Sequence, residues 1–136
     1  FFAFLLGSTQ LWSQASNTVL HVYSLPAHTE TLAFELPSSK VEIIKTKSAR
    51  ISIETTIMLP AGTPPLLDYL IKTKRYDLKA TVDREAHSFT LSPAKLQKTI
   101  IIKGEVCNED IRYKIYVPES ISKVSNTYSS LTASSE

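Results

Sequence analysis

Apolar and polar residues alternate along residues 51–59, and this period restricts the segment to a β-strand with one buried face. The even positions are mostly polar, and the odd positions carry Ile51, Ile53, Ile57 and Leu59. Successive side chains of a strand point to opposite faces, so a strand places these four residues on one side.

The same period recurs along most of the chain. The segments are 31–36, 40–43, 78–83, 88–92 and 112–117, with weaker signals at 19–23 and around Val124. In the third of these, Leu78, Ala80 and Val82 are expected to face the core. Ile100–Ile102 is apolar at every residue, which predicts a central or doubly covered strand. The polar run 83–86 predicts a hairpin turn.

One segment has a helical period instead. Leu66, Leu67, Leu70 and Ile71 fall on one stripe of a helix. Thr63 is placed to cap its start, and Pro64 occupies the first helical position, where a missing N–H is tolerated.

Together these patterns predict an all-β fold, mainly an antiparallel sandwich or a short solenoid-like sheet, with one short helix near residues 64–73. The 136 residues provide for one ordinary domain. Strand spacings of about 8 to 12 residues favour this architecture over alternating strands and helices.

The first residues resemble the end of a secretory signal peptide, with an apolar run followed by small residues near Ala15. We therefore expect a partial signal peptide at residues 1–15, a β-rich domain at 16–128 and a Ser/Thr-rich tail at 129–136. The alternative is that Phe1 to Leu11 form a buried strand or helix. The signal predicts a periplasmic or extracellular protein, and no membrane span is expected in the mature chain.

Motifs for catalysis, cofactors or metals do not emerge from the sequence. His21, His28 and His87 lack the spacing of metal ligands, and three glycines in all argue against phosphate loops and oxyanion turns. Cys107 has acidic neighbours, which are expected to raise its pKa and keep it inert. We therefore predict a non-enzymatic protein without catalytic, cofactor-binding or metal-binding residues.

Two residues are candidates for ligand contact. Tyr116 is expected on the face opposite Ile115, where an exposed ring can stack on a sugar, and Lys114 shares that face. A net charge of +2 is too balanced to indicate a nucleic-acid partner.

Three segments resemble a known group of proteins. Tyr113–Ile121 followed by Lys123–Asn126 resembles the strand, Val-Pro, strand unit of adhesin-like domains (auto-transporter adhesin or head domains) in secreted proteins of Bacteroidetes-type bacteria. Leu66–Leu78 and the Trp12–Ala15 segment are also similar to such proteins. The resemblance implies an all-β, often solenoid-like fold, export and no known catalytic residues.

These observations predict an exported bacterial envelope or surface domain with an interaction or scaffold role. Its partner would be an envelope protein or an anionic or neutral glycan. The alternative is a small carbohydrate-binding module that uses exposed tyrosines.

Overall fold

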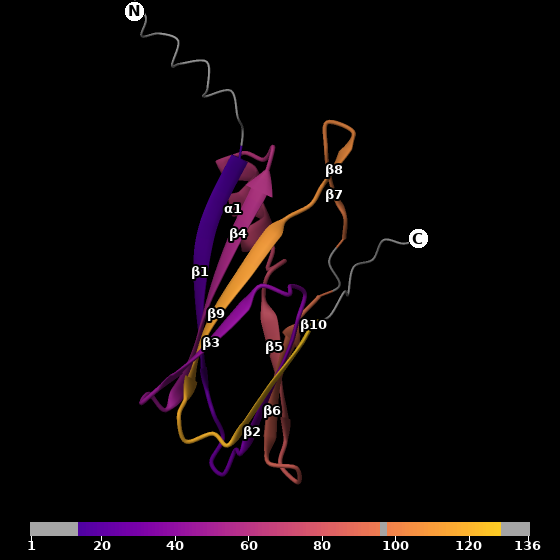
Figure 1. Ribbon diagram of the computed structural model, residues 1–136. Helices are drawn as coiled ribbons and strands as arrows, with labels where there is room; N and C mark the ends of the chain where they lie inside the picture. The colour runs from indigo at the N-terminus through magenta and orange to yellow at the C-terminus, as the bar shows by residue number, and fades with distance from the viewer. Residues whose placement is uncertain (1–13, 96–97, 129–136) are drawn as a thin grey trace, which may run out of the picture.

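The computed structural model describes residues 14–95 and 98–128, and these fold into two four-stranded sheets, a hairpin and one short helix (Figure 1). The elements in chain order are β1 (Gln14–Ser24), β2 (Thr31–Leu36), β3 (Val41–Thr46), β4 (Arg50–Pro60), α1 (Pro64–Lys72), β5 (Leu78–Asp83), β6 (Ser88–Pro93), β7 (Ile100–Ile102), β8 (Glu105–Cys107), β9 (Asp110–Pro118) and β10 (Lys123–Tyr128). The predicted β-rich fold with one helix is confirmed.

The first sheet has the strand order β1-β4-β9-β3. Strand β4 is antiparallel to both β1 and β9, whereas β3 runs parallel to β9. The alternation in β4 has the predicted consequence, because Ile51, Ile53, Ile57 and Leu59 are each 0% exposed. These side chains form one layer of the core.

The second sheet has the order β10-β2-β6-β5. Strands β10, β2 and β6 run parallel to one another, and β5 is antiparallel to β6, which it joins through the predicted turn after Asp83. Both sheets are therefore mixed. Figure 1 shows them as two groups of strands, with β1, β4, β9 and β3 on one side and β2, β5, β6 and β10 on the other.

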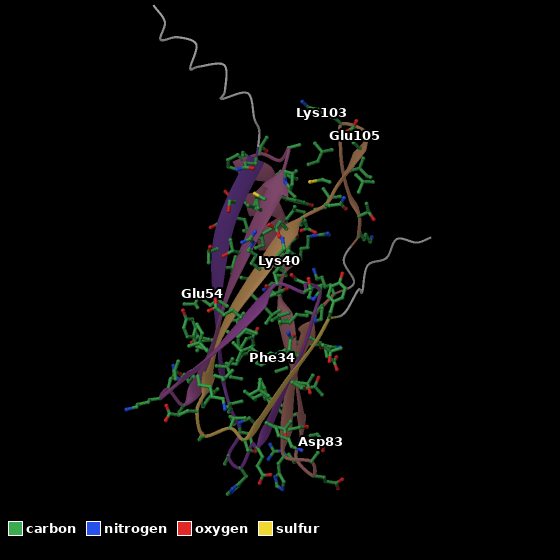
Figure 2. The ribbon with its side chains drawn as sticks, in the orientation of Figure 1. Phe34, Lys40, Glu54, Asp83, Lys103 and Glu105 are labelled. Carbon is green, nitrogen blue, oxygen red and sulfur yellow. The ribbon has the colours of Figure 1, made fainter. Side chains whose placement is uncertain are left out.

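One hydrophobic core joins the two sheets. It contains Leu32, Phe34 and Leu36 from β2, Phe89 and Leu91 from β6, and the inward residues of β4 and β9. Phe34, labelled in Figure 2, is one of these core residues and is 1% exposed. A shared core between two sheets is the arrangement of a sandwich rather than of stacked solenoid coils.

Helix α1 forms as predicted. The Thr63 side chain accepts a hydrogen bond from the N–H of Leu66 at 3.3 Å, and Pro64 is the first helical residue. Leu67 is buried, and the other three residues of the predicted stripe, Leu66, Leu70 and Ile71, are partly buried against the core. Across the described ranges, no helix is long and apolar enough to cross a bilayer.

Two strands differ from their predictions. Ile100–Ile102 is not a covered central strand: as β7 it pairs only with β8 in the part of the chain that the structure describes, and Ile101 is 57% exposed. Figure 1 shows this β7–β8 hairpin projecting away from both sheets. In β5, Ala80 and Val82 are exposed rather than buried, and only Leu78 at the start of the strand packs against the core.

The first strand is longer than the sequence indicates. It begins at Gln14 rather than near Val19, and Ala15 lies in the core opposite Leu59. Residues 1–13 and the tail 129–136 lie outside the described residues, so the signal peptide, its alternative as a buried strand or helix, and the tail stay predictions.

Candidate functional site

Strand β9 carries both residues that the sequence nominates for ligand contact. Lys114 and Tyr116 are half-buried on the outer face of the first sheet, while Ile115 between them is in the core. In the strand register, Lys114 lies between Glu54 of β4 and Glu42 of β3. The structure thus confirms the side of the strand on which both residues lie.

The neighbours of Tyr116 are not aromatic. Its partners in the register are Ser52 and Ile44, so this part of the sheet builds no pair of stacking tyrosines around it. Three other tyrosine side chains are partly or fully buried, and this burial raises the pKa of each hydroxyl: Tyr23, Tyr76 and Tyr113.

A groove of about 370 Å³ runs over the outer face next to Lys114. Its lining is mainly charged and consists of Lys40, Val41, Glu42, Glu54, Thr56, Arg112, Tyr113 and Lys114. Lys40 and Glu54 are labelled in Figure 2, where their side chains lie on the same part of the sheet. The groove holds both hydrogen-bond donors and acceptors, and across the strands Lys114 is flanked by Glu42 and Glu54.

The charges of this groove largely compensate one another. Lys40 Nζ lies 2.7 Å from Asp110 Oδ1, and Arg112 lies 3.4 Å from the second oxygen of the same carboxylate. The hydrogen bond from Lys40 holds the pKa of Asp110 below its usual value. Because each cation has an acidic neighbour, the groove suits a neutral polar ligand better than an anionic one.

A second polar cluster lies at the start of β9 and was not foreseen from the sequence. Arg75 donates to both oxygens of Glu109, at 2.8 and 3.0 Å, and the Tyr76 hydroxyl also donates to this carboxylate. The exposed fractions of the Arg75 and Glu109 side chains are only 13% and 9%. These hydrogen bonds hold the loop after α1 against the start of β9. The cluster therefore has a structural role.

The residues next to Arg75 and Glu109 in the sequence do not indicate that these two side chains pair. The sequence places Arg75 in a basic group with Lys72 and Lys74, and Glu109 in an acidic turn with Asp110. The two residues are 34 positions apart and meet only when the sheets form.

The histidines do not assemble a site. His21 lies on β1, stacks on Tyr23 and lies 3.5 Å from Asp77. His28 and His87 occupy turns with positive φ and line a hollow of about 220 Å³ near the end of β5. Among residues 14–95 and 98–128, no three His, Cys, Asp or Glu side chains are placed to hold a metal ion.

Cys107 is a thiol held at the base of the projecting hairpin. Its Sγ donates to the carbonyl of Pro60 at 3.0 Å. Burial, and then the charge of Glu109, raise its pKa, in the direction predicted from its acidic neighbours. A raised pKa leaves the thiol protonated and unreactive at neutral pH.

In comparisons with protein-family models, curated proteins and solved structures, no match to this chain was found.

Proposed function

We propose that this chain is an exported, non-enzymatic domain of a bacterial envelope or surface protein, with an interaction or scaffold role. Strand β5 is the observation that carries the interaction role. It is the last strand of its sheet, residues 79–83 are exposed, and β6 is its one neighbour within the described residues. Such an edge presents unpaired N–H and C=O groups that add another strand.

The extracytoplasmic location is supported by the apolar run ahead of Ala15 and by the resemblance to secreted adhesin-like proteins. Fractionation of the producing cells, with an intact mass of the recovered protein, tests this part. We expect a species that starts near Ser16, outside the inner membrane. An uncleaved cytosolic species would contradict export.

The interaction role is tested by a photo-crosslinking amino acid at position 81, at the middle of the β5 edge. The matched control carries the same probe at Asp68, which is exposed on helix α1. In intact cells we expect intermolecular adducts from position 81 and none from position 68. Equal labelling from both positions, or none from position 81, would contradict a role for this edge.

The groove beside Lys114, with Tyr116 on the same face of β9, favours one second candidate, a small carbohydrate-binding module. The hydroxyl groups of a neutral sugar can both donate to and accept from the charged side chains that line this groove. Titration with neutral oligosaccharides, followed by the backbone NMR signals of β9, tests this candidate. Shifts that centre on Lys114 and disappear in Tyr116→Ala would support it, and signals that do not move would exclude it for those sugars.

A further inference from the structure

The free edge of β5 has a defined hydrogen-bonding pattern. The N–H of Ala94 donates to the carbonyl of Asp77 at 2.9 Å, so the groups of Asp77 point toward β6. Groups alternate in direction along an antiparallel strand. With the register of β5 on β6, the N–H and C=O groups of Ala80 and Val82 therefore point to the open side.

The charges of β5 are arranged symmetrically about its centre. Lys79 and Asp83 lie two residues before and two residues after Thr81, and all three are exposed on the outer face of the sheet. Asp83, labelled in Figure 2, lies at the end of the strand near one tip of the molecule. Its Oδ1 accepts the N–H groups of Glu85 and Ala86, which leaves Oδ2 able to accept a cation.

We propose that two copies of this chain associate through β5, antiparallel, with Thr81 on the two-fold axis. This inference rests on the interaction role proposed above, and it identifies the partner of the β5 edge as a second copy of the chain. In this register Lys79 of each copy lies opposite Asp83 of the other, and Ala80 lies opposite Val82. Four backbone hydrogen bonds, between Ala80 and Val82 of the two copies, join the sheets.

In this register, each exposed side chain of residues 79–83 lies opposite a side chain of the second copy. Opposite charges directly across two strands stabilise their pairing. On the inner face, Val82 is 41% exposed and meets Ala80 of the second copy. The same two-fold operation thus pairs the charged side chains on one face and the apolar ones on the other.

The other outermost strands lack this complementarity. In β3 the opposite charges, Glu42 and Lys45, are three residues apart and point to different faces. Strand β10 carries one charged residue, Lys123, and β1 carries no acidic residue and no Lys or Arg. Among the edge strands of the two four-stranded sheets that the structure describes, β5 is the one whose charges match a second copy of itself.

Disulfide trapping in the full chain tests the register. Thr81→Cys is combined with Cys107→Ser, which keeps a donor for Pro60. On the axis, the two Cα atoms would be about 4.5 Å apart, within the range of a disulfide. The matched control is Lys79→Cys with Cys107→Ser, whose thiols would be about 14 Å apart along the strands. We expect at least about tenfold faster dimer trapping from position 81.

A charge exchange tests the contacts by sedimentation equilibrium. One strand per copy is a small interface, so association is measured from about 10 μM to 1 mM. Lys79→Glu and Asp83→Lys each create two like-charge contacts and are expected to weaken the dimer about tenfold. The double variant restores opposite charges. We expect its dimer constant to return to within about threefold of the original.

The double variant and Asp83→Lys both lack the carboxylate that caps the turn, so their difference isolates the contact with residue 79. Equal trapping from positions 79 and 81, or a double variant no tighter than Asp83→Lys, would overturn the proposal. A chain that stays monomeric at 1 mM overturns it too. If the probe at position 81 then labels a different protein in cells, self-association is wrong while the interaction role stands. If it labels nothing, both are wrong.

Discussion

At the residue scale, Thr55 is a polar group in an apolar layer. It is 0% exposed on the inner face of β4, and its Oγ1 has no hydrogen-bond partner within the described residues. Thr55→Val keeps the shape and removes a buried hydroxyl, so the free energy of unfolding should rise by about 1 kcal/mol. Urea unfolding measures this change.

The control is Thr56→Val on the opposite face, where the hydroxyl bonds to Thr18 at 3.0 Å. This exposed substitution should give no gain in stability. A loss of stability in Thr55→Val would show that its hydroxyl is satisfied in solution.

The ion pair between Arg75 and Glu109 gives a second test at this scale. Glu109→Ala leaves a guanidinium that is only 13% exposed without its carboxylate. Removal of one partner from a buried pair costs about 3–5 kcal/mol, and we expect the unfolding free energy to fall by about 3 kcal/mol.

Asp110→Ala is the matched control in the adjacent position. The partners of Asp110, Lys40 and Arg112, are 54% and 64% exposed, and the loss of such a pair costs about 1 kcal/mol or less. Similar effects from the two substitutions would contradict a special role for the buried pair.

At the element scale, the N-cap of α1 can be tested by itself. The Thr63 hydroxyl accepts the N–H of Leu66, so Thr63→Ala should lower the unfolding free energy by about 1 kcal/mol. Thr63→Ser keeps the oxygen and should retain most of the stability. Thermal and urea unfolding compare the three chains, and an equal loss in the serine variant would attribute the effect to the methyl group.

Local sequence patterns predict an element well when the interactions that form it join residues only a few positions apart. Thr63 and Pro64 fix the start of α1 because capping involves residues three positions apart. The inward face of β4 is also set locally, because the alternation of apolar and polar residues lies within the strand itself. Periodicity states which side chains lie together, however, and not whether another layer covers them. That is why Ile101 and Val82 were expected in the core and are exposed.

At the scale of the whole molecule, the sequence predicted a sheet fold but not the order of its strands. The parallel pairs β2–β6 and β3–β9 join segments far apart in the chain, and no turn between them reveals the pairing. The candidate site shows the same limit. The face of Lys114 and Tyr116 was predictable from the alternation in β9, whereas the groove needs Lys40 and Glu54 from other segments.

The first strand connects the proposed export with the stability of the sandwich. Gln14 and Ala15 pair with Pro60 and Leu59, and Ala15 is 3% exposed in the core. Cleavage after Ala15 would remove this end of β1 and uncover part of Leu59. A chain that starts at Gln14 should therefore exceed one that starts at Ser16 by about 1–2 kcal/mol in urea unfolding, from apolar burial and ladder hydrogen bonds.

Ala15→Gly in the longer chain separates these two contributions, because it removes the methyl group and keeps the ladder. Equal stability of the two lengths would mean that Ala15 adds nothing to the core. Cleavage near Ala15 would then leave the fold unaffected. If the longer chain is more stable and the exported protein nevertheless starts at Ser16, export shortens β1 at a cost in stability. The exposed edge of β4 near Leu59 then becomes a second place where another strand can pair.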